Sequence, residues 1–101
     1  MKNEALRSAL GFAQRAGKLL SGDFACEKAV KSGKAMLVAL DESVSDATHA
    51  RYGGMCERAG IPCLLVEEMD TAIGRGGKKI AAVTDSGFAR MIEEKARGGV
   101  D

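Results

Sequence analysis

The most informative chemistry in the sequence is a cationic and aromatic face on a helix predicted to begin near Gly22 or Asp23. Phe24, Lys28 and Lys31 recur at i, i+4 and i+7, which places the three side chains on one helix face. Amides at a helix N-terminus bind phosphate, lysines supply positive charge, and an exposed ring stacks on a base. This combination favours an RNA-binding surface. The alternative is a solvated lysine face with Phe24 folded back onto the first turn.

A second candidate is the glycine-rich stretch Gly74-Arg75-Gly76-Gly77-Lys78-Lys79. Glycines let backbone amides approach an anion. The stretch does not match the phosphate-loop motif Gly-x-x-x-x-Gly-Lys-Ser/Thr, and it precedes a predicted strand instead of following one, which argues against nucleotide binding of that type. Two interpretations stay open: a flexible connection, and a loop that contacts nucleic acid through its three cations.

The sequence lacks the residue groupings that catalysis and metal binding need. It has no Gly-x-Ser-x-Gly elbow, and its single histidine, His49, is expected to be a half-exposed surface residue. Cys26, Cys56 and Cys63 show no Cys-x-x-Cys spacing and are expected to be small buried hydrophobic residues in a reducing compartment. We therefore expect no enzymatic activity, no bound metal and no cofactor.

Acidic residues follow two of the predicted strands. Asp41 and Glu42 come after one strand, and Glu67 and Glu68 come after another. Because the strand ends of open α/β sheets often bind ligands, a small-molecule or nucleotide binder is one alternative function. The simpler interpretation is that these acids cap helices and face solvent.

Composition indicates one globular domain. The chain has 101 residues, of which 46% are hydrophobic and 29% are charged, enough for one ordinary core. No apolar run approaches the roughly 20 residues that span a bilayer, and the N-terminal residues lack the apolar core of a signal peptide. We expect a cytoplasmic monomer without membrane contact, with one domain over residues 1–97 and a frayed tail over residues 98–101.

The net charge of +1 conceals an uneven distribution along the chain. Residues 1–34 carry a net charge of +4, residues 35–70 carry −5, and residues 71–101 carry +2. If the two basic segments meet in space, they form a local patch that attracts anions. Scattered solvating charges are the alternative.

Hydrophobic periodicity predicts an alternating order of helices and strands. Helices are expected over residues 4–16, from 22 or 23 to 33, from after residue 43 to about 59, over 69–73, and from 85 or 86 onward. Strands are expected over residues 36–40, 61–66 and 80–84, with a short extended connection over 18–21. This alternation predicts an α/β domain with a mostly parallel sheet flanked by helices.

Several segments, in order along the chain, match a known family. They are Leu10–Lys18, Ser21-Gly22, Lys28–Val38, Ile73-Gly74 and Ala82–Ala89. Together they resemble the kink-turn-binding ribosomal-protein superfamily, and the first and last resemble its bacterial YlxQ-like branch; the resemblance extends over residues 4–93. It implies a three-layer α/β/α sandwich around a four-stranded mixed sheet, with residues 18–20 as the fourth strand.

The resemblance also implies where RNA is bound. Classical members of the superfamily use Gly-x-Asn-Glu-x-x-Lys at the start of the second helix. Gly22 and Lys28 match this motif, whereas Phe24 and Ala25 occupy the Asn and Glu positions. Because these two polar residues supply base-edge hydrogen bonds, the resemblance implies RNA binding but does not extend to kink-turn specificity. A second contact loop, here residues 75–80, is implied to lie beside the start of the second helix.

We therefore predict a non-catalytic protein that binds structured RNA, with kink-turn and ribosomal RNA among the candidates and a fused or separate basic partner as a further option. The predicted RNA contacts are Gly22, Asp23, Phe24, Lys28, Lys31, Arg75, Lys78 and Lys79. The main alternative is a protein-interaction module that has lost RNA binding and uses an exposed Phe24 as its apolar anchor.

Overall fold

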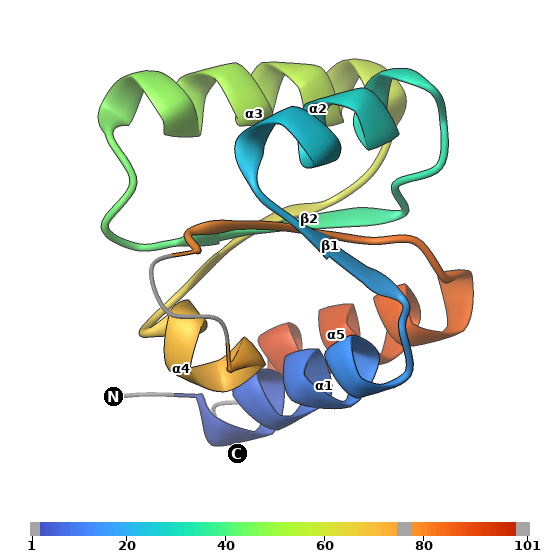
Figure 1. Ribbon diagram of the computed structural model, residues 1–101, viewed down its shortest axis with the longest axis vertical. Helices are drawn as coiled ribbons and strands as arrows, with labels where there is room; N and C mark the ends of the chain where they lie inside the picture. The colour runs from blue at the N-terminus through green and yellow to red at the C-terminus, as the bar shows by residue number, and fades with distance from the viewer. Residues whose placement is uncertain (1–2, 75–77, 99–101) are drawn as a thin grey trace.

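In the part of the chain that the structure describes, five helices and four strands form three layers. The computed structural model describes residues 3–74 and 78–98, and within them the elements are α1 (Glu4–Arg15), β1 (Leu19–Ser21), α2 (Asp23–Lys31), β2 (Leu37–Asp41), α3 (Asp46–Ala59), β3 (Cys63–Val66), α4 (Met69–Ile73), β4 (Ile80–Val83) and α5 (Ser86–Gly98). Helices α2 and α3 cover one face of the sheet, and α1, α4 and α5 cover the other (Figure 1). The predicted α/β/α sandwich is confirmed.

Local sequence signals set the ends of the helices. The Asn3 side chain accepts a hydrogen bond from the Leu6 amide at the start of α1, and Ser45 caps α3 through the Thr48 amide. Gly60 ends α3 in the left-handed conformation, with φ of 72°. These signals explain why the predicted helix boundaries lie within a few residues of the observed ones.

The sheet is mixed, with strand order β1-β4-β2-β3. Strands β2 and β3 pair in parallel, and β4 lies antiparallel between β1 and β2. The expectation of mostly parallel pairing is wrong, because β4 runs against both of its neighbours. Between β3 and β4 the described residues form only the five-residue helix α4, about 7.5 Å long, instead of the longer crossover helix that usually joins parallel strands. Strand β4 therefore enters at the end where β3 leaves. The mixed sheet implied by the family resemblance is confirmed.

Side chains of the central strand β2 alternate between the two helical layers. Leu37 and Ala39 pack in the cluster formed with α1, α4 and α5, whereas Val38 and Leu40 pack in the cluster formed with α2 and α3. All residues of β2 are buried, as the unbroken apolar run predicted. The sheet thus anchors both layers and holds α2 firmly over one face.

The cysteines pack as apolar side chains. Cys26 and Cys56 are buried, and Cys63 is half-buried. Burial raises the pKa of the Cys26 and Cys56 thiols to about 12, so both stay protonated at neutral pH. For Cys26 and Cys56 the predicted role as buried hydrophobic residues is confirmed.

Within the residues that the structure describes, none of the helices combines the length and apolar character that crossing a membrane requires. The same residues contain no group of three or more His, Cys, Asp and Glu side chains placed to hold a metal ion.

Candidate nucleic-acid interface

The predicted site segments meet at the end of the sheet where β1 finishes and β4 begins. The Gly22 amide donates a hydrogen bond to the Ile80 carbonyl, with an N···O distance of 2.9 Å. A Cβ atom built on Gly22 would lie 3.9 Å from the Lys78 ammonium nitrogen. Lys78, just before β4, therefore lies beside the start of α2, and described residues of the two basic segments meet there.

Gly22 shapes the entry to α2. Its backbone has φ of 100° and ψ of 149°, a conformation that essentially only glycine adopts at low cost. Among the described residues no side chain caps this helix end, so the first-turn amides lack the partner that Asn3 and Ser45 give to α1 and α3. Exposed amides of this kind can accept an anion, which the helix dipole also favours.

Phe24 projects from the first turn into solvent. Its side chain is 84% exposed, so the alternative in which the ring folds back onto the helix is wrong. Phe24, Glu27, Lys28, Lys31 and Ser32 line a shallow hollow of about 470 Å³ on the outer face of α2. A flat aromatic ring beside a hollow of this size, with ammonium groups on its rim, is suited to stacking a base.

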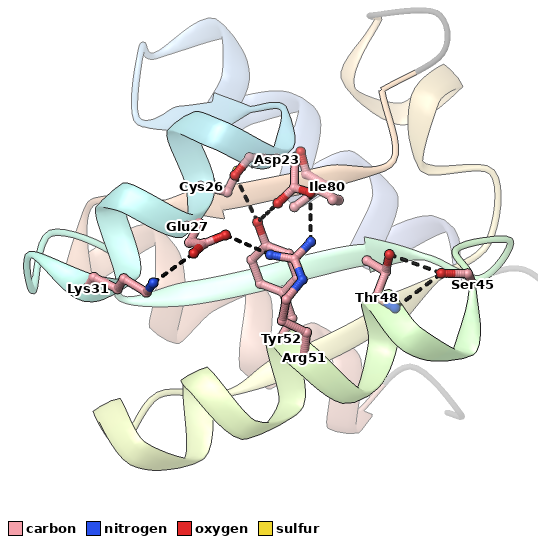
Figure 2. Close-up of polar contacts among 9 residues, drawn as sticks. All are labelled: Asp23, Cys26, Glu27, Lys31, Ser45, Thr48, Arg51, Tyr52 and Ile80. Atoms are coloured by element: carbon pink, nitrogen blue, oxygen red, sulfur yellow. Dashed lines mark hydrogen bonds and ion pairs between the residues drawn. The ribbon is translucent and has the colours of Figure 1, made fainter.

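Asp23 differs from the other predicted contacts because its carboxylate is turned toward α3. Its Oδ1 accepts a hydrogen bond from the buried Tyr52 hydroxyl at 2.6 Å, and its Oδ2 pairs with an Arg51 nitrogen at 2.6 Å (Figure 2). These two partners hold the pKa of Asp23 below its usual value, Arg51 having the larger effect. Burial, followed by the Asp23 hydrogen bond, raises the pKa of Tyr52. The side chain of Asp23 joins two helices, although it remains about half exposed, with 53% of its surface accessible.

The two lysines of α2 have different surroundings. Lys31 pairs with Glu27 one turn earlier, at 2.7 Å, and this pair lowers the pKa of Glu27. Lys28 is exposed and forms no ion pair within the described part of the chain. Within the described residues, no ion pair therefore compensates the charge of Lys28, whereas Glu27 partly compensates the charge of Lys31.

The lysines before β4 are separated as well. Lys78 lies near Gly22, whereas Lys79 lines a hollow of about 290 Å³ at the acidic strand ends, together with Asp41, Glu42, Ser43, Glu68 and Asp70. The Asp41 amide donates to the Lys79 carbonyl at 2.8 Å. The predicted contact Arg75 lies outside the described residues. Of the two described lysines before β4, Lys78 is the one that lies beside the start of α2.

The acidic strand end is built around Asp41, which is buried. Its Oδ1 accepts the Met69 amide at 2.8 Å, and its Oδ2 accepts the Ser43 amide at 2.9 Å and the Ser43 hydroxyl. Burial opposes ionisation, but these hydrogen bonds and nearby Lys79 outweigh it, so the pKa of Asp41 lies below its usual value. Asp41 thus holds the start of α4, as the capping interpretation predicted, but its carboxylate is buried and does not face solvent as that interpretation also expected.

Replacing Asp41 with Asn is expected to lower the free energy of unfolding at neutral pH by about 1–3 kcal/mol, because two amides and a hydroxyl lose a charged acceptor. The lowered pKa makes this contribution fully present above about pH 4, and it disappears as the pH falls through the folded-state pKa. The difference in unfolding free energy between variant and wild type, measured by urea unfolding, should be smaller at pH 3 than at pH 7. Asp46→Asn, an exposed control, should change little, and an undiminished difference at pH 3 would contradict the prediction.

Comparison with solved structures defines the class of fold. The chain superposes on a protein of unknown function from Bacillus halodurans with a TM-score of 0.87 and 30% identity, over 91% of this chain and 96% of that one. It superposes on the Giardia lamblia 15.5kD RNA binding protein with a TM-score of 0.77 and 16% identity, over 96% of this chain and 86% of that one, which shows the shared fold. The chain therefore shares its three-layer α/β/α fold with both of these structures.

Curated relatives identify the branch. The chain is 34% identical over 86 residues to the RNA-binding protein YlxQ of Bacillus subtilis (strain 168), spanning 82% of this chain and 86% of the relative. It is 27% identical over 92 residues to the RNA-binding protein YlxQ of Enterococcus faecium, spanning 88% of each. No protein-family model matches the chain. The chain belongs to the YlxQ family.

Proposed function

We propose that the chain is a non-catalytic RNA-binding protein that receives structured RNA at the start of α2 and at the loop before β4. The observation that carries the proposal is the meeting of Gly22, uncapped helix amides and Lys78 at one end of the sheet, beside an exposed Phe24. Relatives that span most of the chain are named RNA-binding proteins.

Each contact has a distinct role in this proposal. The amides after Gly22 receive a phosphate, Lys28, Lys31 and Lys78 supply charge, and Phe24 stacks on an unpaired base. Arg75 and Lys79 hold the flanking backbone. Because Phe24 and Ala25 cannot make the base-edge hydrogen bonds of Asn and Glu, we expect recognition by backbone shape and stacking more than by kink-turn readout. We place this activity in the cytoplasm, in a monomer, on ribosome-related RNA.

A protein-interaction module is the second candidate, and the exposure of Phe24 favours it. An apolar ring that is 84% exposed is also the kind of anchor that a partner protein buries. In that case loss of Phe24 abolishes partner binding, whereas loss of Lys28 has little effect.

The direct test is a low-salt titration of the chain against a kink-turn RNA, an unrelated hairpin and a single-stranded RNA. With about four to six phosphate contacts, log K should fall against log salt concentration with a slope of roughly −3 to −5. Lys28→Ala should weaken binding about tenfold and make the slope shallower by about one.

Lys34→Ala is the matched control, because this exposed lysine follows the far end of α2 and its loss changes the net charge equally. It should leave RNA affinity within about twofold of wild type, where Lys28→Ala does not. A kink-turn preference that Lys28→Ala removes would indicate the classical readout, and similar salt-dependent binding to all three RNAs would indicate a general RNA surface. A slope near zero or no binding to any RNA would overturn the proposal in favour of the protein-interaction module.

A further inference from the structure

Two carboxylates stand on the helix that is proposed to receive RNA. Asp23 and Glu27 lie at i and i+4 on α2, and Glu27 lines the same hollow as Phe24 and Lys28. An uncompensated carboxylate repels phosphates over a Debye length of about 8–10 Å. An interface at this place therefore requires that both charges be neutralised from within the protein.

The guanidinium of Arg51 on α3 pairs with both carboxylates at once. Its Nη2 lies 2.6 Å from Asp23 Oδ2, and its Nη1 lies 2.7 Å from Glu27 Oε1 (Figure 2). The planar arginine fork fits two acceptors in a fixed geometry, which a point-like ammonium cannot reproduce. With Lys31 on the other oxygen of Glu27, two acids and two bases form one neutral group.

The side chain of Tyr52 also holds this group in place, from the side that faces the sheet. Tyr52, the residue after Arg51, is fully buried between the helices and the sheet and donates its hydroxyl to Asp23. The Arg51 guanidinium carbon lies 4.8 Å from the centroid of the Tyr52 ring, a cation–π contact. Consecutive residues of α3 thus hold the first turn of α2 in place, through the ion pair of Arg51 with Asp23 and the hydrogen bonding of the Tyr52 hydroxyl to Asp23.

We infer that Arg51 is a positioning residue of the RNA interface: it shields RNA phosphates from Asp23 and Glu27 and anchors the start of α2, without itself contacting RNA. The inference rests on the proposed RNA-binding function. It changes the role predicted for Asp23, whose carboxylate serves the interface only through its partners on α3. Lys28 is then left as the uncompensated cation beside Phe24.

The test is a titration of a kink-turn RNA hairpin at low salt with variants of the full chain. Arg51→Gln should weaken binding about five- to tenfold, because it leaves two carboxylates beside the phosphate path. Arg51→Lys keeps the positive charge but cannot reproduce the paired geometry with both carboxylates, so its RNA affinity should lie between those of wild type and Arg51→Gln. Wild-type affinity in Arg51→Gln would overturn the inference. If the wild type itself binds no RNA, the proposed function fails and this inference with it.

A rescue experiment separates shielding from direct contact. In a chain carrying Asp23→Asn and Glu27→Gln, adding Arg51→Gln should change affinity less than twofold, since no carboxylate is left to shield. Arg51→Gln combined with Glu93→Gln and Glu94→Gln has the same net charge, but its altered acids lie on α5, across the sheet (Figure 1). This control variant should bind RNA as weakly as Arg51→Gln alone. A loss in the Asp23→Asn, Glu27→Gln background as large as in wild type would mean that Arg51 contacts RNA directly.

Folding is followed in parallel by thermal melting. If Arg51→Gln alone does not fold, the comparison within the Asp23→Asn, Glu27→Gln background still decides the question, because that background contains no carboxylate that the loss of Arg51 would leave unpaired. There, unchanged RNA affinity supports the inference and a loss of tenfold or more overturns it.

Discussion

Replacing Gly22 with valine is expected to reduce RNA affinity by at least about 30-fold and to lower the free energy of unfolding by about 1–3 kcal/mol. The stability cost arises because a β-branched residue at φ of 100° is strained. The affinity cost arises because the new side chain stands beside the α2 amides, close to the Lys78 ammonium. RNA titration and urea unfolding of the same preparation measure the two effects.

Gly33→Val is the matched control for this prediction. Gly33 also has a positive φ, 82°, and a Cβ atom there would meet no atom within 4 Å. It lies beyond the C-terminal end of α2, so a β-branched residue at a positive φ is introduced there far from the proposed contacts. The folded Gly33→Val protein should bind RNA as the wild type does. Equal RNA affinity of the two folded variants would place the interface elsewhere on the chain.

Local signals in the sequence predicted where the helices and strands lie along the chain, but not the direction in which each strand runs in the sheet. The apolar run Met36–Leu40 and the stop at Gly60 predict β2 and the end of α3 within a residue or two. The direction of β4 depends on how far α4 can carry the chain, which the alternation of helices and strands does not reveal. Strand β1 has three residues, too few for a periodic pattern: the pattern predicted only a short extended connection over residues 18–21, and the family resemblance identified it as a strand.

The sequence predicted the part of the candidate site whose side chains are exposed along one face of a single helix. Spacing along one helix indicated the exposed face of Phe24, Lys28 and Lys31. The role of Arg51 was missed because its partners lie on a different helix, 24 and 28 positions earlier in the chain. The sequence does show acids at i and i+4 with Lys31 following, which indicates a charged ladder on α2. The cation that completes it becomes visible only when α3 packs beside α2.

Replacing Phe24 with alanine is expected to reduce RNA affinity about 10- to 100-fold, since stacking of a base on an aromatic ring contributes about 1–3 kcal/mol. Stability should change by less than about 0.5 kcal/mol, because the ring is 84% exposed and supports no core. The expected result is therefore a fully folded protein with a large binding defect. Fluorescence titration with RNA containing unpaired bases, together with thermal melting, measures both quantities.

Phe12→Ala is the matched control for the Phe24→Ala prediction. Phe12 is 54% exposed and contacts Arg15, with 4.8 Å from the guanidinium carbon to the ring centroid, but it lies on α1, across the sheet from α2 (Figure 1). Its loss should leave RNA affinity unchanged. If Phe24→Ala and Lys28→Ala both weaken RNA binding and Phe12→Ala does not, stacking and charge act together at the start of α2. If Phe24→Ala leaves RNA affinity intact, the exposed ring has another use, and a partner protein that buries it becomes the better explanation of its position.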